Sequence, residues 1–99
     1  MIYLNTDNLI EVDGLTNQTS DQYVNDATVA GTLYSEAGTS LATFALNYVN
    51  SSSGDYQGTL SQTVVSANCT QHNEYIIAIT ANTHEIGRER HFADYRGWE

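Results

Sequence analysis

The sequence predicts an all-β fold, an immunoglobulin-like antiparallel β-sandwich of about seven short strands. Apolar residues alternate with period two far more often than they recur at helical spacing. Clusters of Gly, Asn, Asp and Ser interrupt the alternating segments at intervals of roughly 8 to 15 residues, as turns do between the strands of a sandwich. The strands can be assigned in order along the chain.

The chain has 99 residues, which is enough for one domain built around one hydrophobic core. We expect a single β-sandwich domain over residues 1–99, with residues 1–26 as a loosely patterned N-terminal segment. Within that segment, residues 2–4 and 9–12 are expected as short strands, and residues 21–26 as a loop or brief strand.

Three alternating segments in the middle of the chain predict a hairpin with a third strand added: residues 28–34, 43–49 and 56–60. A turn at residues 35–38 joins the first two, and a polar loop at 50–55 precedes the third. Alternation assigns one face of each strand to the core: Val29, Gly31, Leu33, Phe44, Leu46, Tyr48, Tyr56, Gly58 and Leu60.

The second half of the chain predicts a crossover and two further strands. Residues 61–73 are mostly polar and fit a connection with one helical turn. Residues 74–81 are the strongest strand, apolar on both faces and therefore expected at a central position. A turn over residues 82–87 and a returning strand over residues 88–95 complete the sheet.

Charge is distributed very unevenly along the chain. There is no lysine, the first arginine is Arg88, and residues 1–87 hold nine carboxylates. The last twelve residues balance three arginines against three carboxylates, so the net charge of -9 belongs to the body. An acidic body argues against nucleic acid as a partner and favours a soluble protein that docks through one end. The N-terminus lacks a signal-peptide pattern, and no apolar run is long enough to indicate a membrane partner.

The sequence offers no catalytic or metal-binding motif, so we expect neither an enzyme nor a cofactor. His72, His84 and His91 are separated by twelve and seven residues, which matches no compact ligand set. There is no Gly-x-Ser-x-Gly motif, and a small sandwich rarely has room for a cleft between two catalytic carboxylates. Cys69 is the single cysteine and is expected to be a structural residue near a loop.

Two binding roles stay open as alternatives. Oxygen-bearing residues in the first quarter could take calcium, although capping of turns explains them better: Asp7, Asn8, Asp13, Asp21, Asn25 and Asp26. The aromatic residues expected outside the core could form a platform for sugar: Tyr3, Tyr23, Tyr95 and Trp98.

The C-terminal segment is the best candidate for a contact with another protein. It combines the residue types that are enriched in binding hot spots: Arg88, Arg90, Tyr95, Arg96 and Trp98. The alternative is a last strand whose arginines neutralise the acidic sheet and whose Trp98 covers the core, and both roles are compatible. The chain also has no proline to protect edge strands, which leaves inward charges, short strands or pairing with a neighbouring protein.

The order of these segments resembles that of small immunoglobulin-like virion proteins of tailed bacteriophages. The resemblance covers residues 27–96 and rests mainly on Gly54-Asp55-Tyr56-Gln57-Gly58-Thr59-Leu60 followed by Tyr75-Ile76-Ile77-Ala78-Ile79. Many extracellular sandwich modules share this pattern. Most such modules are embedded in longer chains, whereas this sequence holds a single one.

The resemblance implies a structural virion protein, assembled in the host cytoplasm, with the major capsid protein or another virion protein as its partner. A capsid decoration or cement protein is the expected role, and the carboxy-terminal strand and residues 2–4 are the expected contacts. The alternatives are a tail, neck or baseplate component, a carbohydrate-binding or adhesion module, and an acidic inhibitor that mimics DNA. A homo-oligomer is left open.

Overall fold

The protein is described by a computed structural model over residues 1–17 and 19–95. Along these residues run seven strands and one short helix: β1 (Ile2–Tyr3), β2 (Asn8–Val12), β3 (Val29–Ser35), β4 (Ser40–Tyr48), β5 (Tyr56–Leu60), α1 (Gln62–Asn68), β6 (Glu74–Ala81) and β7 (His84–Asp94). No helix in this part of the chain is long and apolar enough to cross a membrane.

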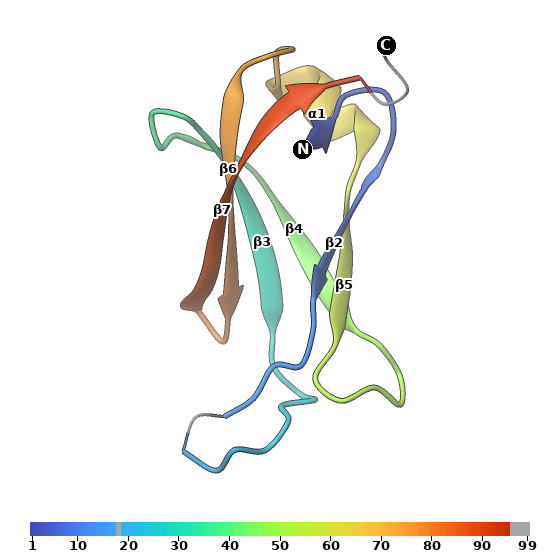
Figure 1. The fold of residues 1–99 in the computed structure, drawn as a ribbon, viewed down its shortest axis with the longest axis vertical. Coiled ribbons are helices and arrows are strands. Elements are labelled where there is room, and N and C mark those ends of the chain that lie inside the picture. The colour runs from blue at the N-terminus through green and yellow to red at the C-terminus, as the bar shows by residue number, and fades with distance from the viewer. Residues whose placement is uncertain (18, 96–99) are drawn as a thin grey trace.

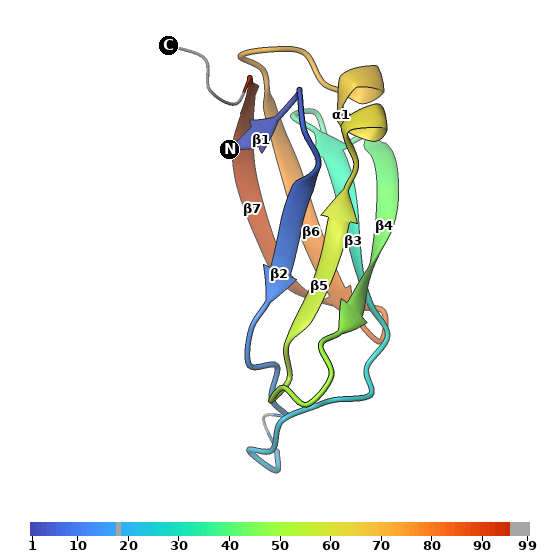
Figure 2. The same cartoon turned by 90° about the vertical axis from the view of Figure 1, so that its right-hand side faces the viewer.

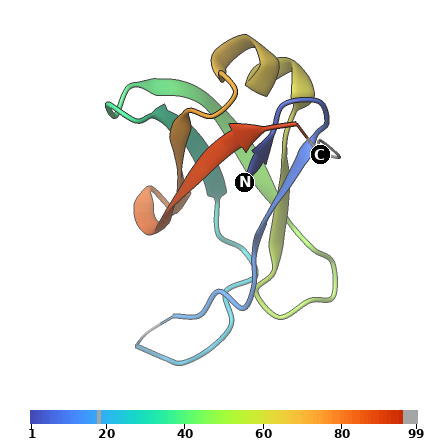
Figure 3. The same cartoon turned by 45° about the horizontal axis from the view of Figure 1, so that its top comes forward.

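The strands form one mixed sheet in the order β1-β7-β6-β3-β4-β5-β2. All neighbouring pairs are antiparallel except β1 and β7, which run parallel. Figure 1 and Figure 3 show that the sheet curls, so that its two edges approach. The predicted all-β class is confirmed. The finer prediction of a two-layered immunoglobulin-like sandwich is not confirmed, because all seven strands belong to one continuous sheet that is nearly a barrel.

Most strand positions agree with the sequence prediction, and β5 and β6 match it at both ends. The turn between β6 and β7 differs from the prediction. It was expected over residues 82–87, but β7 already begins at His84. Asn82 and Thr83 both have positive φ, 50° and 72°, as in the tight two-residue turns that suit the twist of a hairpin. The longer hairpin includes a register shift between Ile79 and Thr80, which accommodates an extra residue in β7.

Helix α1 forms within the predicted crossover and covers one end of the curled sheet (Figure 2). The Ser61 hydroxyl caps the helix by accepting a hydrogen bond from the Val64 backbone N–H at 3.3 Å. Val65 faces the core and is fully buried, and Cys69 ends the helix. The expected single helical turn is therefore a seven-residue helix.

The core fills the inside of the curl. Leu33, Leu60 and Val65 are completely buried at the helix end, while Val29 and Tyr56 pack at the other end. The expectation that β6 is covered on both faces is confirmed, because four consecutive residues of it are buried: Tyr75, Ile76, Ile77 and Ala78. It lies inside the sheet, between β7 and β3.

The N-terminal segment contributes directly to this core. Ile2 and Leu4 are buried, and the Leu4 backbone N–H donates to the Asp94 carbonyl at 2.8 Å. The Asn8 carboxamide, 7% exposed, accepts from the Tyr3 N–H at 2.8 Å and donates to the Tyr3 carbonyl at 2.9 Å. The carboxamide thus accepts and donates as the backbone of a neighbouring strand residue would. The two bonds tie β2, at one edge of the sheet, to β1 at the other.

Gly31 on β3 is directly opposite Phe44 on β4, and the Phe44 ring lies where a Cβ atom of residue 31 would be. We expect Gly31→Ala to lower the free energy of unfolding by about 1–3 kcal/mol, because the ring would have to leave its packed position. Urea denaturation measures the change.

Gly87 on β7 provides the matched control, because nothing lies within 4 Å of a Cβ atom built there. Gly87→Ala should leave stability unchanged within about 1 kcal/mol or raise it slightly. Equal losses in the two variants would contradict the packing of Phe44 on Gly31.

Candidate partner-binding surface

Strand β7 places two of the predicted contact residues on its outer face. Arg88 is opposite Ala78 and Arg90 is opposite Ile76, whereas the intervening Glu89 is opposite Ile77, whose side chain belongs to the core. Because side chains alternate along a strand, Arg88 and Arg90 share the face that points away from the core. Phe92 follows on the same face and is 56% exposed. The outer row of β7, defined by Arg88, Arg90 and Phe92, is thus a strip of two cations and one aromatic ring.

Both arginines of the outer row are held by carboxylates. Arg88 Nη2 lies 2.8 Å from Glu85 Oε1, and its guanidinium carbon lies 5.4 Å from the centroid of the Tyr34 ring on β3. The hydrogen bond and charge of Glu85 raise the pKa of Arg88 above its ordinary value. Arg90 forms an ion pair with Glu74. Exposed pairs of this kind contribute little to stability, so the guanidinium groups can be re-paired by a partner at small cost.

The remaining predicted contact residues lie at the end of β7. Tyr95 directly follows the strand and is 43% exposed. Arg96 and Trp98 lie outside the described residues. Three of the five predicted residues are therefore placed, and these three lie on or next to one strand.

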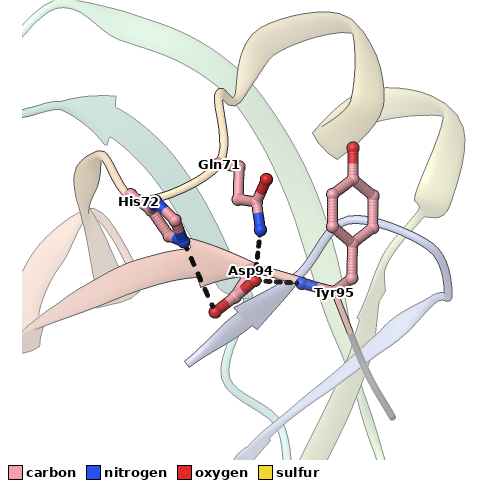
Figure 4. A network of polar contacts seen from close by, with 4 residues as sticks. All are labelled: Gln71, His72, Asp94 and Tyr95. Carbon is pink, nitrogen blue, oxygen red and sulfur yellow. Dashed lines mark hydrogen bonds and ion pairs between the residues drawn. The ribbon is translucent and has the colours of Figure 1, made fainter. Parts of the chain in front are cut away.

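Asp94 fixes the end of β7 against the loop that follows α1 (Figure 4). Its Oδ1 accepts hydrogen bonds from Gln71 Nε2 and from the Tyr95 backbone N–H, both at 2.8 Å. His72 Nε2 lies 4.0 Å from Oδ2, and the His72 backbone N–H donates to the Ala93 carbonyl at 2.7 Å. These contacts lower the pKa of Asp94 below its ordinary value. The hydrogen bond from Gln71 has the largest effect, the one from the Tyr95 backbone is next, and the charge of His72 adds to both. The backbone at Tyr95 is thereby held in a defined direction.

The three histidines are not gathered into one site. His72 lies beside Asp94, His84 opens β7, and His91 lies with Nε2 3.2 Å from Glu89 Oε2. Within residues 1–17 and 19–95 there is no group of three or more His, Cys, Asp or Glu side chains that could hold a metal ion.

The Asp and Asn residues considered for calcium act in turns and strand ends. Asp7 Oδ1 accepts from the Gln62 N–H at 2.8 Å, and Asn25 Oδ1 accepts from the Gly54 N–H at 2.9 Å. Asn8 joins β2 to β1. In each of these three residues the side-chain oxygen accepts a hydrogen bond from a backbone N–H of another segment.

Three of the four aromatic residues considered for sugar binding are placed by the structure, and Trp98 lies outside the described residues. Tyr23 is 57% exposed in the loop between β2 and β3, at the bottom of Figure 1, whereas Tyr95 lies beyond the end of β7 at the top. Tyr3 is partly buried. Tyr23 and Tyr95 thus belong to segments at opposite ends of the molecule.

Phe92 is a candidate contact residue that the sequence analysis did not select. It lies two residues after Arg90 and four after Arg88, so in a strand its side chain shares their face. This spacing could have identified Phe92 from the sequence. A phenylalanine normally indicates core, and only the register with Glu74 shows that it points outward.

Comparison with known proteins returned no match among protein-family models, curated proteins or solved structures. The function is therefore inferred from the residues and from their geometry.

Cys69 is buried at the end of α1, and desolvation raises the pKa of its thiol to about 11. At pH 8 nearly all of this thiol is protonated and shielded, so it should react with iodoacetamide much more slowly in the native protein than in urea. Mass spectrometry of timed samples measures the ratio. Equal rates in the folded and unfolded protein would contradict a buried, structural cysteine.

The lowered pKa of Asp94 predicts a pH dependence of stability. Its contribution is fully present above the unfolded-state pKa of about 4 and is lost as the pH falls through the lower folded-state pKa. We expect Asp94→Asn to be less stable than the wild type at pH 7, and the difference to shrink in acid. Urea denaturation across this range tests it, with Asp26→Asn as the control for net charge. A difference that persists unchanged in strong acid would contradict the network of Figure 4.

Proposed function

We propose that this protein is a structural subunit that docks on a larger protein assembly through the outer row of β7. More specifically, we propose a decoration or cement protein that binds the assembled capsid of a tailed phage. The docking role rests on the outer row of β7. Its residues Arg88, Arg90 and Phe92 project from one face of a strand that lies near the edge of the sheet.

The composition of the outer row suits a protein contact. Arginine is enriched in binding hot spots because it combines a large contact area with directed hydrogen bonds, and phenylalanine is enriched in interface cores through its apolar area. Covering a fully exposed phenylalanine ring is worth about 1.5–3 kcal/mol, and Phe92 is already partly covered, so its contribution would lie toward the lower end. The two guanidinium groups can donate to carboxylates or carbonyls of the partner.

The charge distribution gives the docking an orientation. Nine of the twelve carboxylates precede Arg88, and all three arginines follow residue 87. A partner surface with carboxylates would attract the two arginines of the outer row and repel the acidic rest of the molecule, which favours one docking pose during association.

The assignment to a phage particle rests on the resemblance to immunoglobulin-like virion proteins, and the immunoglobulin-like relationship is part of the proposal. A small acidic β-domain with one docking strand is consistent with a subunit present in many copies on a shell. A tail, neck or baseplate component is the alternative within the same class. A carbohydrate-binding module gains no support from Tyr23 and Tyr95, which lie far apart in the fold.

The proposal is tested by mixing the purified protein with expanded, undecorated phage capsids and pelleting the particles. We expect sedimentation with the capsid at a fixed stoichiometry. Phe92→Ala should weaken this binding by at least about tenfold, because the residue would be central to the contact. Added subunit should also raise the temperature at which the particles rupture, because it binds only the assembled shell.

Tyr23→Ala is the matched control, since it removes an aromatic ring of similar exposure at the other end of the molecule. It should bind as the wild type does. Protein that stays wholly in the supernatant would exclude the capsid role, and equal losses in both variants would exclude the outer row as the contact.

A further inference from the structure

An apolar groove lies where the curled sheet fails to close. It has a volume of about 550 Å³ and lies between β2 and β7, below the short strand β1. Its lining includes five isoleucines, one each from β1, β2 and β7 and two from β6: Ile2, Ile10, Ile77, Ile79 and Ile86. Figure 2 shows β1 in the upper part of this opening, with β2 and β7 on either side.

Both walls of the groove are strand edges. The pairing of β7 with β1 is limited to Ala93 and Asp94, so over residues 84–92 β7 has no described strand beside it on the side away from β6. Strand β2 pairs with β5 along its whole length and has no neighbour strand on its other side in the described sheet. Edges of this kind present backbone N–H and C=O groups that can pair with a further strand.

Strand β1 shows the direction that an added strand would take. It runs parallel to β7, with Ile2 opposite Ala93 and Tyr3 opposite Asp94, and it occupies only the upper end of the opening. An added strand on the same line would be parallel to β7 and antiparallel to β2. Five residues of β2 face the opening, which corresponds to about 16 Å of extended chain.

We propose that this groove binds an extended, basic segment of a protein partner, which inserts as a strand between β2 and β7 and completes the barrel. Its apolar side chains would cover the isoleucines of the groove, and its backbone would pair with either or both edges. This inference does not depend on the proposed role of the outer row, because the groove opens on the edge of β7 rather than on its outer face.

Carboxylates outnumber cations around the groove, which favours a basic occupant: Asp7, Glu11 and Glu89 line it, together with Arg88 and the N-terminal ammonium of Met1. Glu89 faces inward opposite Ile77, yet its side chain is 77% exposed because the opening lies beside it. Glu11 on β2 is also exposed. Arg88 also lines the groove, but its guanidinium is paired with Glu85 and lies over the Tyr34 ring on β3. Lysine or arginine in an inserted strand would meet Glu11 and Glu89, the latter already 3.2 Å from the His91 ring, whereas a purely apolar strand would bring no charge to either carboxylate.

A second copy of this chain is a poor occupant for the same reason. Each copy carries a net charge of -9, and insertion of an acidic strand beside Glu89 and Glu11 would bring like charges together. A basic segment gains both the backbone pairing and the opposite charge. The occupant is therefore expected to come from another protein.

The test uses a synthetic peptide of about seven residues with alternating valine and lysine, long enough to span β2. Titration into labelled full-length protein, followed by NMR, should shift the amides of β2 and of residues 84–92 and slow their hydrogen exchange. Binding should weaken as salt is added, because exposed charges contribute to it. A peptide of alternating valine and glutamate should bind more weakly, and one with a central proline should lose the protection.

Charge reversal locates the site. Glu89→Lys combined with Glu11→Lys should weaken the valine-lysine peptide by about three- to tenfold, as expected for two exposed charge pairs. Glu36→Lys is the control, because it changes the charge of one residue in the same way but lies in the turn between β3 and β4, away from the groove. It should have little effect on binding. All three substitutions are at exposed carboxylates, and the same spectra check that each variant is folded.

A covalent version removes the problem of weak peptide affinity. Since β1 runs parallel to β7, the valine-lysine segment fused ahead of Met1 would follow β7 down the groove, and it should raise the melting temperature above that of a valine-glutamate fusion. Equal melting temperatures and the absence of shifts with the free peptide would overturn the proposal. Concentration-dependent protection of the same amides without peptide would replace it with self-association.

Discussion

The fold depends on how the two edges of one sheet are joined. The buried Asn8 carboxamide accepts one hydrogen bond from the Tyr3 backbone and donates another to it, and β1 pairs in parallel with β7. Together these contacts connect β2, at one edge of the sheet, to β7 near the other. A carboxamide can replace a strand residue here because it offers one acceptor and one donor in the spacing of a peptide group. The junction is short, so the sheet closes at one end and stays open below it.

This partial closure gives β7 two surfaces with different properties. Its outer face carries Arg88, Arg90 and Phe92, whereas its free edge borders an apolar groove whose rim is acidic. The first surface suits a flat contact made by side chains, and the second suits an added strand paired through the backbone. Because the two surfaces point in different directions, one molecule could connect two partners at once.

Much of the architecture follows from local patterns in the sequence. The alternation over residues 56–60 and 74–81 defined β5 and β6 at both ends, because the side-chain period of a strand is fixed by backbone geometry. The charge gradient toward Arg88 and the structural nature of Cys69 also follow from residue types alone. The turn at Asn82 and Thr83 was misjudged, since its length depends on backbone conformations that polar residues in a loop do not reveal.

The sequence by itself thus determined the all-β class, most strands and the segment that carries the exposed arginines. Only the tertiary structure decided that the strands form one curled sheet, because strand order depends on contacts between residues far apart in the chain. It also decided that Phe92 points outward and that Glu89 points inward, since the face of a side chain is set by register across the hairpin. The groove is the clearest such case: β2 and β7 are distant in sequence, and it exists only where their edges approach without meeting.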